Sequence, residues 1–345
     1  LPAASGGWIR IFSADAFPYA STDEYIQDGL VAHYDGINNA DMGDKYHDNA
    51  ATVWKNLKGI TTLPDAEMCI SANCQTQGLG GNISWTSNSA YIDNANVNNW
   101  FRINRTDYIP DEYTLEVVYK TNADYISTAR DLVSNWNFGG FGFSSSGGIG
   151  NGYFDENEVG LVQWLETKEL PNPGGGNHYK TSEGIFFAKN QLLTLSGQLI
   201  NNDIDGCWLS VYVNGEGRSK QISTSAAQTK MPNIPTVWSI GADPQGSGSA
   251  ACYQKDAHFY SVRVYNTMLS QLQIQHNTAL DQKRYLAPPT VTIDGSPCTN
   301  VTVLSPRIIT CLAPPSGTTG PATVIVDKAE GGNLLTLTNE FEYLP

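Results

Sequence analysis

Charged side chains are scarce in this sequence, and positive ones are the scarcer kind. Only 16% of the 345 residues are charged, and 34 acidic residues against 20 lysines and arginines give a formal net charge of −14. No cluster of lysines and arginines interrupts this balance. Because an acidic surface repels phosphate backbones, we expect no nucleic-acid partner.

Long apolar runs are also lacking. No stretch approaches the roughly 20 apolar residues that a membrane helix needs, so we expect no membrane insertion. Three catalytic patterns are missing as well: Gly-x-Ser-x-Gly for a serine nucleophile, His-x-x-x-His for zinc, and a glycine loop ending in Gly-Lys-Ser/Thr for phosphate. His33 and His258 fall in strand patterns and are predicted to be packed or hydrogen-bonded. The chain is therefore predicted not to be an enzyme.

Glycine, serine, threonine and asparagine are plentiful instead, beside a hydrophobic content of 40%. This mixture is typical of short strands joined by tight turns, and it argues against helical bundles. In the clearest strand, Tyr113, Leu115, Val117 and Tyr119 alternate with more polar positions, as in an antiparallel strand buried on one face. Asn214-Gly215 predicts a hairpin turn. The predicted fold class is all-β.

One helix is predicted over residues 271–284. Ser270 stands at the N-cap position with Gln273 three residues on, which is the spacing of a capping box. Pro288-Pro289 then ends the helical pattern and marks a domain boundary.

Three segments follow from this boundary and from the strand patterns. Residues 1–27 form a lead-in segment that holds one strand-like run at 8–12. Residues 28–287 form the large domain, and residues 288–345 form a small β domain.

Six cysteines allow 15 pairings, and the sequence alone does not choose among them. Proximity along the chain favours three bridges: Cys69–Cys74, Cys207–Cys252 and Cys298–Cys311. Because disulfides persist in oxidising compartments, we expect an extracellular or cell-surface location. The alternative is six buried free thiols in a cytosolic protein, since a free cysteine packs as a small hydrophobic residue.

Several runs of the large domain resemble bacterial laminin-G-like domains, which have the concanavalin A-like lectin/glucanase fold. The matching runs follow the family's order: Gly29-Leu-Val-Ala-His-Tyr-Asp35, Trp54-Lys-Asn-Leu57, Leu209-Ser-Val-Tyr-Val-Asn-Gly215, Ser239-Ile-Gly-Ala242 and Phe259-Tyr-Ser-Val-Arg-Val-Tyr-Asn266. The resemblance spans about residues 28–285 and implies a jelly-roll sandwich of two sheets. The family includes glycan binders, protein binders, calcium-dependent modules and spacers, so the fold alone implies no single function.

The tail resembles a short IPT/TIG domain, which is a small immunoglobulin-like β-sandwich. The matching positions are Cys298, Val301, Val303, Ser305, Ile308, Cys311, Pro314-Pro315, Gly320, Val324 and Val326. The family's opening strands are shortened here, which leaves a sheet edge for the large domain or another chain to cover. A strand of residues 1–27 lent to a neighbouring copy would cover it by β-augmentation. The alternative is that residues 1–27 pack on their own domain.

Two acidic runs are candidate calcium sites, because Ca²⁺ takes oxygen ligands from turns. Asp203 and Asp205 lie two apart just before a glycine, and Asp155 and Glu158 belong to an acidic turn. Neither run completes a calcium-binding loop, so ordinary Asx-rich and solvated turns are the alternatives. Calcium is thus an optional cofactor, and no other cofactor is expected.

Aromatic and polar residues gather along 136–164 in a pattern that suits sugar binding. Sugars stack their apolar faces on aromatic rings, while amides and carboxylates bond their hydroxyls. The candidate ligand-binding residues flank a glycine-rich loop and the acidic turn: Trp136, Phe138, Tyr153 and Trp164. The alternative is that these rings belong to the core.

These observations predict an extracellular surface-binding or adhesion module whose partner is a glycan or a cell-surface protein. One alternative is a structural subunit of a surface fibre or pilus-like assembly joined by strand exchange. A second alternative is a glycoside hydrolase, which needs two carboxyls about 5.5 Å apart in a retaining enzyme. Glu156 and Glu158 would share a strand face, but the run does not reproduce the Glu-x-Asp-x-x-Glu pattern of enzymes with this fold.

Overall fold

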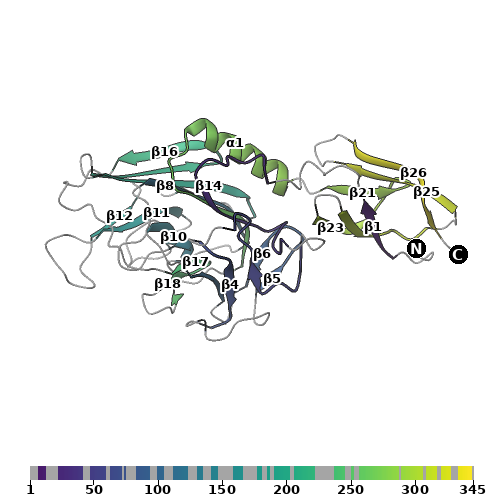
Figure 1. The fold of residues 1–345 in the computed structure, drawn as a ribbon, viewed down its shortest axis with the longest axis horizontal. Helices are drawn as coiled ribbons and strands as arrows, with labels where there is room; N and C mark the ends of the chain where they lie inside the picture. The colour runs from purple at the N-terminus through teal and green to yellow at the C-terminus, as the bar shows by residue number, and fades with distance from the viewer. Residues whose placement is uncertain are drawn as a thin grey trace.

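The computed structural model shows an all-β protein of antiparallel sheets, with α1 (Gln271–Asp281) as the α-helix of the described part. A large two-layer body holds most strands, and a smaller body adjoins it (Figure 1). No helix among the described residues is long and apolar enough to cross a membrane. The structure describes residues 7–12, 22–41, 47–59, 63–71, 74, 83–93, 99–104, 112–122, 130–134, 141–146, 158–165, 177–180, 185–186, 190–202, 206–221, 237–244, 250–251, 256–286, 289–305, 308–316, 320–327 and 333–343.

One layer of the large body is an eight-stranded antiparallel sheet. Its strands are β2 (Leu30–Asp35), β5 (Ile83–Trp85), β6 (Ala90–Ile92), β8 (Glu112–Thr121), β14 (Leu193–Asn202), β15 (Gly206–Val213), β16 (Glu216–Gln221) and β20 (Ala257–Tyr265). The main path runs β16-β15-β14-β8-β20-β6-β5, and β2 pairs with β20. The predicted Asn214-Gly215 turn joins β15 to β16, with φ angles of 49° and 80° at its two residues.

The other layer is a nine-stranded antiparallel sheet. Its strands are β3 (Val53–Trp54), β4 (Ala66–Cys69), β7 (Trp100–Ile103), β9 (Arg130–Ser134), β10 (Phe141–Ser146), β11 (Glu158–Leu165), β12 (Asn177–Lys180), β13 (Ile185–Phe186) and β17 (Trp238–Ile240). The path runs β12-β11-β10-β9-β17-β7-β4-β3, with β13 on β11. A short pair is formed apart from it by β18 (Asp243–Pro244) and β19 (Ala250–Ala251).

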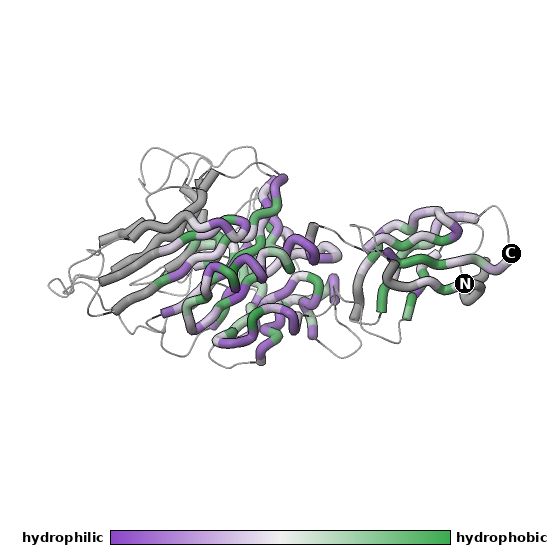
Figure 2. The backbone as a smooth tube through the Cα atoms, turned by 90° about the horizontal axis from the view of Figure 1, so that it is seen from above, coloured by the Kyte–Doolittle hydropathy of each residue, from purple (hydrophilic) through white to green (hydrophobic). Residues whose placement is uncertain are grey.

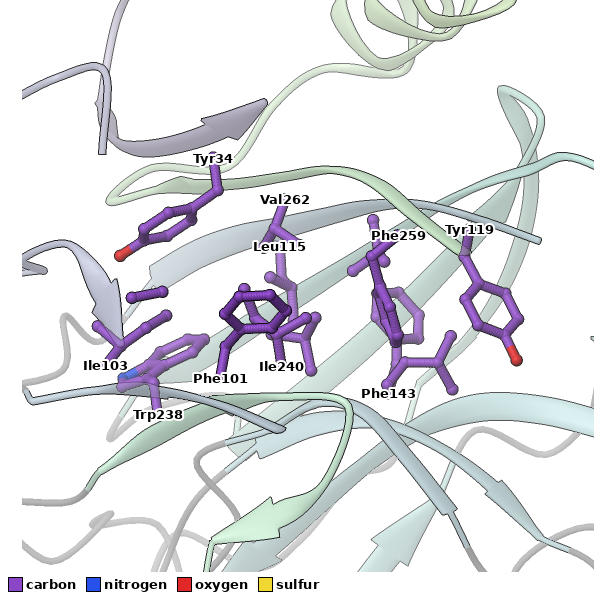
Figure 3. Packing of buried hydrophobic residues seen from close by; sticks show 14 of the residues in the cluster. Tyr34, Phe101, Ile103, Leu115, Tyr119, Phe143, Trp238, Ile240, Phe259 and Val262 are labelled. Atoms are coloured by element: carbon purple, nitrogen blue, oxygen red, sulfur yellow. The ribbon is translucent and has the colours of Figure 1, made fainter. Parts of the chain in front are cut away.

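The main core fills the space between these two layers (Figure 3). Leu115, Phe259 and Val262 come from the eight-stranded sheet and meet Phe101 and Trp238 from the nine-stranded sheet. None of these five side chains is more than 2% exposed. Apolar residues at every second position therefore close two stacked sheets, which confirms the predicted all-β sandwich.

Helix α1 covers part of the outer face of the eight-stranded sheet (Figure 1). It begins with the predicted capping box, because Ser270 Oγ accepts from the Gln273 N–H at 3.3 Å and the Ser270 N–H donates to Gln273 Oε1 at 2.8 Å. After Asp281 the chain continues as a π-helical turn, η3 (Gln282–Leu286). Beneath the helix β8 is buried on both faces, whereas its sequence predicted burial on one face.

A buried ion network connects α1 to the sheet. Arg263 Nε donates to Glu116 Oε2 at 2.9 Å, and the Arg263 Nη atoms donate to the Asp281 carboxylate at 2.7 and 2.6 Å. Asn277 Nδ2 donates to Glu116 at 2.8 Å, and the Tyr25 ring centre lies 4.3 Å from the guanidinium carbon. Removing one partner of such a buried set costs about 3–5 kcal/mol, so the network fixes where the helix lies.

The smaller body is a sandwich of two further sheets (Figure 2). The three-stranded sheet has the order β1-β24-β23 and consists of β1 (Trp8–Phe12), β24 (Ile308–Leu312) and β23 (Thr299–Ser305). The four-stranded sheet has the order β22-β21-β25-β26 and consists of β22 (Ser296–Pro297), β21 (Thr290–Ile293), β25 (Gly320–Asp327) and β26 (Asn333–Tyr343). Buried residues between the sheets include Val291, Ile309 and Val324.

The N-terminal strand β1 belongs to this smaller sandwich. It pairs with β24 in antiparallel register, from Trp8 opposite Leu312 to Phe12 opposite Ile308. The chain's own N-terminal strand therefore covers the edge that the tail sequence leaves open. The later part of segment 1–27 lies against the large body, where Tyr25 is buried and the Ile26 N–H donates to Asn277 Oδ1 at 3.1 Å.

The cysteines only partly follow the predicted pairing. Cys69 and Cys74 are joined by a disulfide. Cys298 and Cys311 are free thiols that hydrogen-bond each other, so the predicted bridge between them is wrong for this structure. The buried Cys311 packs in the apolar cluster of the smaller sandwich as a small hydrophobic side chain does. The predicted Cys207–Cys252 bridge involves Cys252, which lies outside the described residues.

A second buried ion pair lies where β2 meets the end of the helical segment. Asp35 accepts from Arg284 Nε at 2.9 Å, from Arg284 Nη2 at 3.0 Å and from the Tyr285 hydroxyl at 2.5 Å. Burial opposes ionisation of Asp35, but Arg284 outweighs it and lowers the pKa of Asp35 to about 2. His33 Nε2 lies 3.9 Å from the same carboxylate, and burial lowers the pKa of His33 to about 3.

We predict that Ile11→Ala destabilises the smaller sandwich by about 2–5 kcal/mol, because Ile11 is 3% exposed in its core. Arg10→Ala is the matched control on the same strand, where the side chain is exposed and its loss changes stability by no more than about 0.5 kcal/mol. Calorimetric unfolding of the whole chain measures both effects. Equal melting temperatures for the two variants would contradict the pairing of β1 with β24.

We predict that Cys298 is alkylated before Cys311. The hydrogen bond from Cys311 lowers the pKa of the half-buried Cys298 thiol, while the same bond and burial raise the pKa of Cys311. Iodoacetamide labelling of the native chain followed by peptide mass spectrometry measures the order. Faster modification of Cys311 would contradict the prediction, because it would make Cys311 the more reactive thiol.

We predict that His33→Gln makes the free energy of unfolding less dependent on pH in the acidic range. The pKa of His33 falls from 6.5 to about 3 on folding, so the unfolded chain binds this proton more tightly. The stabilising contribution is complete above about pH 6.5 and is lost as the pH falls towards 3, by up to about 4–5 kcal/mol. Denaturant unfolding at pH 7 and pH 4 measures the slope, and identical slopes in wild type and variant would refute the assignment.

Candidate functional site

The residues that the sequence selected for ligand binding fall mostly beyond the described part. Trp136, Phe138 and Tyr153 lie outside the described residues. Trp164 lies in β11 opposite His178 of β12. The sugar site predicted there stays a prediction.

Most of the predicted calcium ligands also lie outside the described residues. Asp155, Asp203 and Asp205 lie outside the described residues, and Glu158 is the first residue of β11, opposite Ser146 and Phe186. Within the described ranges, no group of three His, Cys, Asp or Glu side chains is placed to hold a metal ion. Calcium binding also stays a prediction.

A row of three rings lies on the outer face of the eight-stranded sheet, on β6 and β20. Tyr91 and His258 face each other across these strands with ring centroids 4.7 Å apart and an interplanar angle of 35°. Tyr260 follows with its ring centroid 6.0 Å from that of His258 and an angle of 29°. Tyr91 and His258 are partly exposed, while Tyr260 is 6% exposed. We call Tyr91, His258 and Tyr260 the aromatic row.

Tyr260 lies on the same face as His258, which is two positions before it in the strand, and it is the extra residue of a bulge in β20. The register of β20 against β8 shifts between Phe259 and Ser261. Before the shift Phe259 points into the core, and after it Val262 does, so the apolar period is interrupted by one extra residue. Tyr260 therefore lies outside the main core and packs against Tyr285, with ring centroids 5.5 Å apart.

Polar groups border the row at the end of β8 and the start of β20. The Tyr91 hydroxyl donates to Asp256 Oδ1 at 2.8 Å, and Asn122 Nδ2 donates to the same oxygen at 3.0 Å. Asp256 has a φ of 47°, an uncommon backbone conformation for a non-glycine residue. On the other side of the row, Ser89 Oγ lies 3.0 Å from His258 Nδ1. A carboxylate and an amide thus border the partly exposed rings, while the Ser89 hydroxyl is buried beside His258.

The electrostatic setting keeps the row uncharged near neutral pH. Burial and the neighbouring Lys120, which lies opposite His258 in the sheet, lower the pKa of His258 to about 4, against the attraction of Asp256. Burial, together with the hydrogen bond to Asp256, raises the pKa of Tyr91 to about 12. His258 is therefore a neutral imidazole and Tyr91 a hydrogen-bond donor.

Such a surface can bind a ring-shaped polar molecule. Neutral rings offer apolar faces for stacking, and the groups at their border can donate to and accept from hydroxyls. The strand pattern predicts that His258 is packed or hydrogen-bonded, which is confirmed, but no sequence pattern singles out Tyr91. The usable signal was that Tyr91 lies between the inward-facing Ala90 and Ile92.

The fold and this surface define a β-sandwich protein with an exposed aromatic row. No family model and no curated protein sequence matches the chain. Among solved structures it is similar to domain 4 of AbnA, an extracellular GH43 arabinanase from Geobacillus stearothermophilus in complex with arabinotriose. The identity is 13%, 72% of this chain and 98% of that one are covered, and the TM-score is 0.47.

Two other solved structures are similar to the chain at a comparable level. The binding domain of botulinum neurotoxin DC in complex with SialylT is 9% identical, with 79% of this chain and 55% of that one covered and a TM-score of 0.47. Trypanosoma rangeli sialidase is 13% identical with a TM-score of 0.41, and the match covers 74% of this chain but 33% of the sialidase. Similarity at this level assigns no function to the chain.

We predict that Lys120→Met raises the pKa of His258, because the Lys120 charge is one of the causes that lower it. Lys120→Arg keeps the charge and leaves the pKa of His258 low. Titration of the His258 ring protons by NMR measures both. An unchanged pKa in Lys120→Met would mean that Lys120 does not lie beside the row.

Proposed function

We propose that this chain is a secreted or cell-surface binding module that recognises a glycan through the aromatic row. Tyr91 and His258 supply partly exposed aromatic rings, which suit contact with the apolar face of a sugar. Asp256 and Asn122, which are partly exposed, supply hydrogen-bonding groups at the edge of the rings. The observation that carries the proposal is this combination of partly exposed stacked rings with a bordering carboxylate and amide.

The extracellular location is supported by the Cys69–Cys74 disulfide, because such bonds persist in oxidising compartments. The motif order of the large domain supports a laminin-G-like assignment within the sandwich class, and the tail motif supports an IPT/TIG-like one. We propose a binding role rather than catalysis, since the groups around the row suit stacking and hydrogen bonding of an intact sugar.

Strand exchange between copies is not the function that we favour. In the structure β1 pairs with β24 of its own chain. The strand predicted to join copies is therefore already used within one molecule.

Glycan-array binding of the purified chain tests the proposal. We expect Tyr91→Ala and His258→Ala to weaken binding at least about tenfold, because losing an aromatic anchor costs about 2 kcal/mol. His276→Ala is the matched control, since this histidine is exposed on α1 away from the row. Repeating the array with EDTA tests whether glycan binding requires calcium, for which Asp203 and Asp205 are predicted ligands.

Two outcomes would contradict the proposal. One is the absence of binding to any glycan by a folded chain. The other is a bound glycan that is released by Trp164→Ala while both variants of the row bind normally, which would place the site at residues 136–164.

A further inference from the structure

The outer face of β1 carries the most exposed aromatic side chains of the described residues. Trp8 is 64% exposed and Phe12 is 61% exposed, and Arg10 between them is exposed as well. Ile9 and Ile11 point the other way and are buried in the smaller sandwich. The aromatic pair and the guanidinium therefore form one strip, which we call the β1 strip: Trp8, Arg10 and Phe12.

The backbone N–H and C=O groups of the same three residues point away from β24. The Ala313 N–H donates to the Gly7 carbonyl at 2.8 Å, one position beyond the Trp8–Leu312 pair. In an antiparallel ladder, hydrogen-bonded and non-hydrogen-bonded pairs alternate, so Ile9 and Ile11 exchange their bonds with β24. The N–H and C=O groups of Trp8, Arg10 and Phe12 point to the other side, where no described strand pairs with β1.

The three-stranded sheet has no acidic residues, although the chain as a whole is acidic. The formal net charge of the whole chain is −14, but the three strands β1, β24 and β23 contain no acidic residue. Arg10 is the single charged residue in these three strands. Beside the β1 strip, Ile308, Thr310 and Leu312 of β24 are partly exposed and face the same way.

We propose that the β1 edge binds an extended segment of a partner protein, which adds to the three-stranded sheet as a further strand. The outward backbone groups would pair with the segment. An acidic side chain of the segment would lie over Arg10, and apolar side chains two positions away on either side would pack on Trp8 and Phe12. Tryptophan and arginine are also the residues that most often carry the binding energy of protein interfaces.

The structure favours this occupant over two others. In a symmetric pair of copies with β1 against β1 centred on Arg10, two guanidinium groups would oppose each other, which is destabilising. A glycan could stack on Trp8 and Phe12, but it would leave the row of backbone donors and acceptors without strand partners. The surface is separate from the aromatic row and does not depend on glycan binding.

Selection of linear peptides from a display library against the full chain tests the proposal. We expect the selected peptides to share an acidic residue with apolar residues two positions before and after it. Their binding should weaken at least tenfold on Arg10→Glu, Trp8→Ser or Phe12→Ser. Leu272→Ser is the matched control, because Leu272 is 77% exposed on α1 and lies outside the smaller sandwich. A repeat selection against Arg10→Glu should enrich a basic residue at the central position.

Several results would overturn the proposal. Peptides without the acidic residue, or peptides that bind all three variants normally, would exclude this edge as their site. A glycan-array signal lost on Trp8→Ser would assign the β1 strip to a sugar instead. A dimer in size-exclusion chromatography that dissociates on Arg10→Glu would assign it to a second copy. Unchanged thermal unfolding of the variants checks that they fold, as expected for exposed positions.

Discussion

The contact on which the arrangement of this molecule depends is the buried guanidinium of Arg263. It joins Glu116 of β8 to Asp281 at the end of α1, and all three side chains are fully buried. A charge in this position requires its partners, so the helix lies over one part of the outer face of the eight-stranded sheet. The remaining part of that face keeps Tyr91 and His258 partly exposed. A structural ion network thus determines which part of the outer face the helix covers and which part it leaves partly exposed.

The sequence predicts the sheets well because their residues repeat with period two. The alternation over Tyr113 to Tyr119 predicts a strand of the core, and Ser270 with Gln273 predicts the start of the helix. The same alternation did not reveal that the polar positions between, such as Glu116, are also buried. Their burial depends on Arg263 and Asp281, which come more than a hundred residues later and leave no local signal. The return to the core at Val262 instead of Ser261 depends on a bulge, which likewise becomes visible only in the paired strands.

The spacing of the cysteines predicts one disulfide correctly and one incorrectly. Cys69 and Cys74 are close in sequence and are bonded, whereas Cys298 and Cys311 are adjacent in space and remain thiols. Sequence separation reports whether two sulfurs can meet, and it does not report their oxidation state. The candidate ligand residues Trp136, Phe138 and Tyr153 were selected by composition along one stretch of chain. The aromatic row instead combines strands that are far apart in sequence, so composition along the chain could not find it.

The pairing of β1 with β24 has a consequence for how the chain is made. Trp8 and its partner Leu312 are 304 positions apart in the chain. During synthesis β1 stays unpaired until β24 has been made. Closing so long a loop carries an entropic cost. The smaller sandwich therefore closes only after every strand of the large one has been synthesised.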